Sequence, residues 1–344
     1  MVLVTGGTGL VGSYVLLQLT RKKKQVKALV LGNASKEEEK AEVYRLFKIY
    51  EPEEYQQLYD SIQWVEGNLL DVSSLEQAFT GVSQVYHIAG MTTFDERESS
   101  LQYKVNVEGT KNMLNLSFER KIEKFCFMSS VATLDLLPKQ SFITEESKWN
   151  PKAIHSSYDS TKHEAETEVW KASEKGLKVI VAHPGVVLGS SNWEKNGGLL
   201  YKLSLREKAF YTSGMAAYID AEDVAEICIR LMEDSSIVNE RFILINENMP
   251  FEKIVQFLRK FYDKPLAKKI PDIWLGKLSF LSRIFARIAN KQVVSKAEMN
   301  TLILKDKYSN EKIKKTLKYT FIPIEETLKF HASNYLQYEQ GKNN

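Results

Sequence analysis

Two short stretches of this sequence carry residues that could serve one chemical reaction. The first, Thr5-Gly6-Gly7-Thr8-Gly9-Leu10-Val11-Gly12, directly follows the apolar run Val2-Leu3-Val4. In the second, Tyr158-Asp159-Ser160-Thr161-Lys162, a helix would place the phenol and the ammonium one turn apart on the same face. A glycine turn lets a pyrophosphate approach the backbone, and a phenol beside an ammonium can give or take a proton. Together the two stretches predict an enzyme that moves a hydride with a nicotinamide dinucleotide.

The glycine stretch predicts a buried strand, a tight turn and a helix over about residues 10–21. Gly6 permits the turn, Gly9 has no Cβ to block a pyrophosphate, and Gly12 lets the helix pack on the strand. The N-terminus of that helix then faces the phosphates. The alternative is a glycine turn without a ligand, and the position of this one at the start of a strand–helix alternation argues against it.

The second stretch is interpreted through the acidity of the phenol. A free tyrosine has a pKa near 10, which is high for proton transfer near neutrality. We therefore expect Lys162 to lower the pKa of Tyr158; the alternative is a surface tyrosine beside a lysine.

The apolar run Phe125–Met128 ends in Ser129 and Ser130. These hydroxyls are predicted to face the ligand crevice, unless they merely start a turn.

With these motifs in their order, the chain resembles the extended short-chain dehydrogenase/reductase superfamily. It is most similar to the branch of dihydroflavonol-reductase-like and NAD-dependent epimerase/dehydratase-like proteins. Over roughly residues 1–335 further segments resemble family motifs, with Asn68 where the family often has Asp and His183 where it has Arg; these segments are 67–71, 85–90, 106–110, 184–189 and 218–225. The resemblance agrees with the strand–helix alternation in implying an α/β fold with a Rossmann-type doubly wound parallel sheet.

The resemblance also implies a role for individual residues. Tyr158 would give or take the proton, and Lys162 would lower its pKa and hold the nicotinamide ribose. Ser130 would bond the substrate oxygen, and Asn106 would position a water near Lys162. The implied cofactor-binding residues are Thr5, Gly6, Gly9, Leu10, Val11, Gly12, Asn33, Lys36, Asn68, Leu69, Ala89, Gly90, Tyr158, Lys162, Pro184 and Val186.

The residues after the second predicted strand, which spans 25–31, bear on the choice of cofactor. Folds that prefer NAD place an acid here to bond the ribose 2′-hydroxyl. The segment Leu31–Lys36 has no acid, and Asn33, Ser35 and Lys36 could hold a 2′-phosphate. The sequence therefore favours NADP(H), with NAD(H) as the alternative. The following run, Glu37-Glu38-Glu39-Lys40, is interpreted as a solvated helix start.

The alternation of predicted elements divides the chain into two parts. A dinucleotide-binding domain is predicted over residues 1–183, completed by about 217–246. A smaller, sequence-discontinuous substrate lobe is predicted over 184–216 and 247–344. Within the lobe, residues 271–292 carry apolar side chains at heptad-like spacing. A helix packed on the lobe is the first interpretation, and a dimer contact or a membrane-surface helix are the others.

Composition excludes several classes of protein. The net charge of +3 and the lack of a basic cluster interleaved with aromatics argue against nucleic-acid binding. The two cysteines, Cys126 and Cys228, lie in apolar segments, as suits a reducing cytosol. The sequence contains no run of about 20 apolar residues, so no membrane span is predicted. A cytoplasmic protein is expected. The five histidines show no metal-ligand spacing, so no metal is expected, and His183 is expected to point into the crevice.

Three functions fit these observations. The first is a reductase or dehydrogenase acting on a small carbonyl or secondary alcohol. The second is a nucleotide-sugar epimerase or dehydratase that retains NAD, which the loss of the family Arg at His183 weakens. The third is a non-catalytic dinucleotide-binding protein, which the presence of both Tyr158 and Lys162 disfavours. Substrate, reaction direction and oligomeric state, including a homodimer, are left open.

Overall fold

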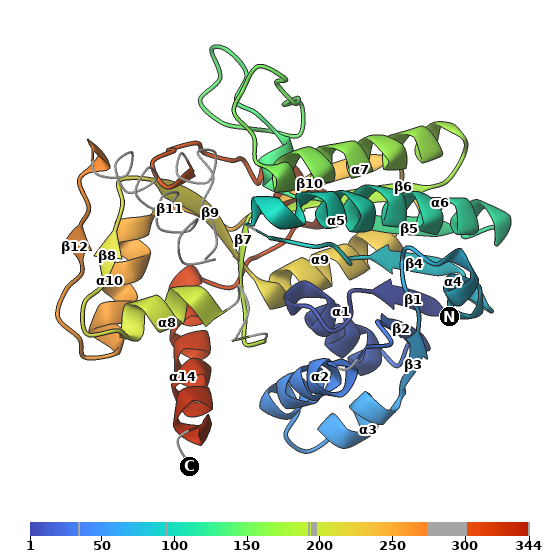
Figure 1. The fold of residues 1–344 in the computed structure, drawn as a ribbon, viewed down its shortest axis with the longest axis horizontal. Helices are drawn as coiled ribbons and strands as arrows, with labels where there is room; N and C mark the ends of the chain where they lie inside the picture. Colours follow the sequence, from blue (N-terminus) through green and yellow to red (C-terminus); the bar gives the residue numbers. More distant parts are fainter. Residues whose placement is uncertain (34, 94, 192, 194–197, 274–300, 343–344) are drawn as a thin grey trace.

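A seven-stranded parallel sheet forms the centre of the molecule (Figure 1). The computed structural model describes residues 1–342 except 34, 94, 192, 194–197 and 274–300. The strand order β10-β6-β5-β4-β1-β2-β3 reverses direction beside β1, as in a doubly wound fold, so the predicted fold class is confirmed. The strands are β1 Val2–Thr5, β2 Val26–Val30, β3 Ile62–Glu66, β4 Gln84–His87, β5 Lys124–Met128, β6 Val179–Pro184 and β10 Glu240–Leu244.

Helices cover both faces of the sheet because neighbouring strand residues point in opposite directions. Val4 packs into one apolar cluster and Leu3 into the other, and both are fully buried. On the Val4 face lie α1 (Leu10–Arg21), α2 (Lys36–Tyr50), α3 (Tyr55–Asp60) and α9 (Ala221–Glu233). On the Leu3 face lie α4 (Val72–Phe79), α6 (Gly109–Glu119) and α7 (Ser157–Glu174).

The helical segment before β5 is interrupted in the structure. Here α5 (Ser99–Tyr103) is separated from α6 by a π-helical turn, Lys104–Glu108. Such turns insert a residue into the helical ladder and occur frequently at functional sites. Here the turn carries Asn106, whose side chain bonds the backbone of Met91 after β4. The periodicity of the apolar residues did not predict this local change.

Most of the remaining elements pack beyond the carboxyl edge of the sheet. They comprise β7 (Val186–Leu188), α8 (Leu199–Leu205), β8 (Phe210–Tyr211), β9 (Met215–Asp220), β11 (Glu247–Pro250), α10 (Phe251–Phe261), β12 (Lys268–Lys269) and α14 (Ile324–Lys342). Trp193, Tyr201 and Tyr335 are buried against one another here, so these aromatics form core. The helix α13 (Glu311–Leu317) instead packs on the Val4 face beside β10. The division into a dinucleotide-binding domain and a substrate lobe stays a prediction.

The structure also bears on the expectations about membrane spans, metal sites and cysteines. Within them no helix is both long and apolar enough to cross a membrane. The same residues contain no group of three His, Cys, Asp or Glu side chains that could hold a metal ion. Cys126 and Cys228 are buried free thiols. Most of the amphipathic segment 271–292 lies outside the described residues.

Candidate active site

A cavity of about 620 Å³ lies where the glycine turn meets the carboxyl ends of β4, β5 and β6. This is the edge at which parallel α/β sheets bind ligands, and the volume suits a cofactor or a drug-sized molecule. Twelve of the predicted site residues line it: Gly6, Gly9, Leu10, Val11, Gly12, Ala89, Gly90, Ser130, Tyr158, Lys162, Pro184 and Val186. The tertiary structure therefore brings the two separate motifs of the sequence together.

The three motif glycines are required for different reasons. Gly6 has φ +69°, and a Cβ there would come within 2.6 Å of the Ala89 amide nitrogen. A Cβ on Gly12 would overlap the Gly6 carbonyl oxygen. A Cβ on Gly9 would meet only that oxygen, at 3.2 Å, so Gly9 is the least crowded of the three, and it lines the cavity. The first turn of α1 begins here and contains no acidic residue, which suits a bound pyrophosphate.

Tyr158 lies in the first turn of α7, and Ser156 and Asp159 form a capping box that fixes the start of this helix. The tyrosine is half-buried and lines the cavity. Burial raises the pKa of Tyr158, and side-chain hydrogen bonds with Ser130 and Thr92 oppose that rise without cancelling it. The phenol is therefore protonated at neutral pH in this structure.

Lys162 follows one turn later in α7 and is almost completely buried. Its ammonium donates to the Met128 carbonyl at 2.5 Å and lies 4.5 Å from the centre of the Phe127 ring. Burial lowers the pKa of Lys162 to about 8, although the charge of Glu166 opposes the shift. The expectation that this lysine lowers the pKa of Tyr158 is not met here, because burial of the phenol outweighs the groups that stabilise the phenolate.

Two predicted residues support the cavity from behind its wall. Asn106 is buried and donates to Thr161 Oγ1 at 3.0 Å, which joins the π-helical turn to α7. Thr5 is also buried, and its hydroxyl contacts His87 Nδ1 at 2.8 Å and accepts from the Ala89 amide at 3.2 Å. Burial, followed by the charge of Lys162, lowers the pKa of His87 to about 3, so this histidine is neutral.

Besides Thr5, four predicted cofactor residues do not line the cavity. Lys36 forms an ion pair with Glu66, at the end of β3. Asn33 accepts from Ser35 Oγ at 3.0 Å, and Asn68 accepts from the Leu70 amide in a turn. The fourth, Leu69, is buried. The motif spacing predicts the chain positions of these residues, but it does not predict which way their side chains turn.

Some residues that line the cavity were not predicted from the sequence, and Thr92 and Glu39 are the polar ones among them that no motif interpretation placed there. Thr92 contacts the Tyr158 hydroxyl, and no motif indicated it. Glu39 was assigned to a solvated run, but it is half-buried at the glycine turn. A signal was present, because Val43 and Phe47 follow Glu39 at helical spacing and are buried, which places Glu39 on the inner face of α2.

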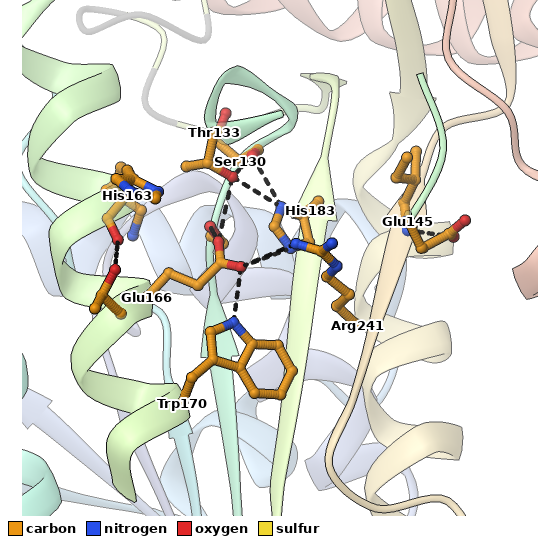
Figure 2. A network of polar contacts seen from close by, with 12 residues as sticks. Ser130, Thr133, Glu145, His163, Glu166, Trp170, His183 and Arg241 are labelled. Atoms are coloured by element: carbon orange, nitrogen blue, oxygen red, sulfur yellow. Dashed lines mark hydrogen bonds and ion pairs between the residues drawn. The ribbon is translucent and has the colours of Figure 1, made fainter. Parts of the chain in front are cut away.

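His183 does not point into the crevice, contrary to expectation. It is completely buried in a polar network beneath Ser130 (Figure 2). Its Nδ1 lies 3.0 Å from the Ser130 carbonyl oxygen, and its Nε2 lies 3.4 Å from Glu166 Oε1. The Glu166 carboxylate also accepts from Ser129 Oγ at 2.6 Å and from Trp170 Nε1 at 3.0 Å. The network ties α7 and β6 to the segment that carries Ser130.

This network is expected to contribute to stability in a pH-dependent way. Burial raises the pKa of Glu166, but the charge and hydrogen bond of His183 and the bonds from Ser129 and Trp170 outweigh it and lower that pKa to about 2. Because the folded pKa lies below the unfolded one, the stabilisation is present above about pH 4.5 and is lost as the pH falls toward 2. Glu166→Gln should lower the free energy of unfolding by about 3 kcal/mol at pH 7.

Urea unfolding of wild type and Glu166→Gln between pH 3 and 7 measures this effect. The difference between their free energies of unfolding should shrink as the pH falls, since a protonated carboxyl resembles the amide. Glu164→Gln changes an exposed glutamate of the same helix and should behave as wild type. An equal loss at every pH would contradict an ionised Glu166.

Comparison with known proteins connects this site to a family. A model of the NAD dependent epimerase/dehydratase family matches residues 2–244. Cinnamoyl-CoA reductase 1 of Oryza sativa subsp. japonica is 25% identical over 285 residues, which cover 79% of each chain. The bifunctional dihydroflavonol 4-reductase/flavanone 4-reductase of Malus domestica is 25% identical over 275 residues, which cover 76% of each.

A solved structure extends the similarity to the whole fold. The UDP-glucose 4-epimerase of Thermotoga maritima superimposes with a TM-score of 0.74 at 20% identity, over 98% of this chain and 99% of that one. The family model covers all seven strands of the central sheet, the glycine turn and the Tyr158–Lys162 pair. On these grounds the chain belongs to the NAD dependent epimerase/dehydratase family.

Proposed function

We propose that this protein is an NAD(P)H-dependent reductase that acts on a small carbonyl compound, or on the secondary alcohol in the reverse direction. The observation that carries the proposal is the arrangement around Tyr158. Its hydroxyl bonds Ser130 and Thr92 in the same cavity that the glycine turn and Lys162 line. A proton donor, a hydroxyl for the substrate oxygen and a cradle for a dinucleotide therefore share one space.

The state of these side chains suits reduction. A phenol with a raised pKa carries its proton at neutral pH and can give it to a carbonyl oxygen as that oxygen gains negative charge. The Ser130 hydroxyl can donate to the same oxygen, which stabilises the developing charge. The buried Lys162 ammonium can hold the nicotinamide ribose and stabilise the phenolate that remains. A bound nicotinamide dinucleotide supplies the hydride.

The similar proteins support the same assignment. The rice and apple proteins are both named as reductases, and each matches about three-quarters of this chain. The substrates in their names are those of the rice and apple proteins and are not assigned to this chain. For this chain we propose only the class of a carbonyl or secondary alcohol.

A carbonyl panel with NADPH and NADH tests the proposal directly. The protein should oxidise one reduced cofactor in the presence of at least one ketone, aldehyde or thioester. The bound cofactor should be identified first, by extraction from the purified protein. Retained NAD that does not exchange, with no reduction of any carbonyl, would instead support a nucleotide-sugar epimerase or dehydratase.

Lys162 should make cofactor binding depend on pH. The ammonium loses its proton as the pH rises through about 8, so affinity for the reduced cofactor should fall over that range. Lys162→Met should bind roughly tenfold or more weakly at pH 7, because a charged hydrogen bond is lost. The same variant should show no pH dependence between 7 and 9. Fluorescence titration measures both effects, and an unchanged pH dependence in the variant would contradict this role.

A further inference from the structure

Two buried side chains hold the turn that carries the Ser130 hydroxyl (Figure 2). Ser129, the preceding residue, donates from its Oγ to Glu166 Oε2 at 2.6 Å. The carbonyl oxygen of Ser130 lies 3.0 Å from His183 Nδ1. Thr133 Oγ1 lies 2.9 Å from the same carbonyl oxygen and 3.2 Å from Glu166 Oε2. Glu166 comes from α7 and His183 from β6, so both elements fix the backbone at Ser130.

The direction of the Ser130 hydroxyl depends on this backbone. Its Oγ accepts from the Ala132 amide at 3.2 Å, and it shares a side-chain hydrogen bond with Tyr158. A hydroxyl has a single hydrogen, and the Ala132 amide occupies one of its acceptor positions. That hydrogen therefore reaches Tyr158 or a substrate oxygen only while the turn keeps its position.

Glu166 also lies near the active-site ammonium. It follows Lys162 by one turn in α7, so the two side chains share one face of the helix, and both are almost completely buried. Burial lowers the pKa of Lys162, and the charge of Glu166 opposes that shift. Two further titratable groups beside this lysine are uncharged, because Tyr158 of α7 keeps its proton and His87 of β4 is neutral.

Two basic side chains from neighbouring strands face the Glu166 carboxylate. His183 Nε2 of β6 lies 3.4 Å from Oε1, and Arg241 Nη1 of β10 lies 3.9 Å from the same atom. Because the other ring nitrogen of His183 faces the Ser130 carbonyl, a protonated ring satisfies both oxygens. On α7, burial lowers the pKa of His163, which leaves that ring neutral at pH 7. With its pKa lowered to about 2, Glu166 stays ionised among these groups.

We propose that Glu166 is a positioning residue of the active site, which orients the Ser130 hydroxyl and supplies the countercharge of Lys162. It thereby couples the group that bonds the substrate oxygen to the group that holds the cofactor. Glu166 does not line the cavity, so it acts through these two residues and not on a bound ligand. The inference rests on the proposed function, since it uses the roles assigned there to Ser130 and Lys162.

Cofactor titration across pH tests the countercharge without any substrate. Glu166→Gln removes the charge but keeps the shape of the side chain, so the ammonium of Lys162 should lose its proton at lower pH. The midpoint at which affinity for NADH or NADPH falls should therefore move down from about pH 8 by roughly one unit. Glu166→Asp keeps the charge and should keep the midpoint close to that of wild type. Glu164→Gln removes an exposed charge from the same helix and should not move it.

Ser129→Ala tests the hold on Ser130 while the charges stay in place. It removes the 2.6 Å bond to Glu166, so kcat with a substrate from the carbonyl panel should fall roughly tenfold or more. KM for the cofactor and the midpoint of cofactor binding should stay at their wild-type values. Ser117→Ala is the matched control, because it removes a buried hydroxyl that bonds the Met113 carbonyl at 2.7 Å in α6, and it should leave kcat unchanged.

Carbonyl reduction by wild type distinguishes a failure of this inference from a failure of the proposed function. An unchanged midpoint in folded Glu166→Gln, or wild-type kcat in Ser129→Ala, would overturn the inference and leave the proposed function standing. If wild type reduces no carbonyl, the proposed function fails, and the shift of the midpoint still decides the countercharge. Circular dichroism reports the fold of each variant, and where Glu166→Gln does not fold, the kcat of Ser129→Ala decides the inference.

Discussion

Tyr158→Phe is expected to reduce kcat by roughly 100-fold or more while the affinity for the cofactor stays within about twofold of wild type. The substitution removes the hydroxyl that bonds Ser130 and Thr92 but keeps the ring in its half-buried position. The carbonyl oxygen would then lack its proton donor, whereas the glycine turn and Lys162 would be unchanged. Steady-state turnover with a substrate from the carbonyl panel, together with cofactor titration, separates the two effects.

Ser130→Ala provides the matched comparison for this experiment. Its hydroxyl also lies at the cavity, so turnover should fall while cofactor binding persists. Tyr103→Phe removes a hydroxyl from an exposed tyrosine elsewhere and should change neither quantity. Near-native turnover by Tyr158→Phe would show that the proton comes from another group.

Gly9→Val is expected to abolish dinucleotide binding in a protein that still folds. The Cβ would meet only the Gly6 carbonyl oxygen, at 3.2 Å, so that oxygen must shift by a few tenths of an ångström. The branched side chain would then occupy the space through which a pyrophosphate approaches the first turn of α1. Circular dichroism and thermal unfolding report the fold, and fluorescence titration reports the loss of binding.

Gly12→Ala tests whether Gly12 is needed for folding, in contrast to Gly9, which is needed for ligand access. Its Cβ would overlap the Gly6 carbonyl oxygen, so we expect a large loss of stability in addition to any loss of binding. If Gly9→Val bound the cofactor as wild type does, the cavity would not be the dinucleotide site. If both variants were equally unstable, the separate role of Gly9 would be wrong.

Much of the fold followed from local patterns in the sequence. The apolar runs at residues 2–4, 25–31 and 125–128 match β1, β2 and β5 to within about two residues, because buried parallel strands are apolar on both faces. The glycine turn and the Tyr158–Lys162 spacing predicted the cavity wall, because turn geometry and the helical repeat are local properties. The π-helical turn at Asn106 was not predicted, since its side chain is held by Met91 in a different loop.

Electrostatics and side-chain direction were decided by tertiary structure. The spacing of Tyr158 and Lys162 says nothing about burial, and burial is what raises one pKa and lowers the other. His183 occupies the strand end that was predicted, yet it faces Glu166 beneath the sheet edge and not the crevice.

The sequence by itself determined that this chain forms a doubly wound sheet with a glycine turn and a tyrosine–lysine pair at one edge. Those features depend on residues near one another in the chain. The Glu39 carboxylate in the cavity wall accepts from Thr8, which is 31 positions away and meets it only because α2 packs beside the glycine turn. Residues 31–36 contain no acid, so only the tertiary structure shows that a carboxylate from the next helix lines the cavity.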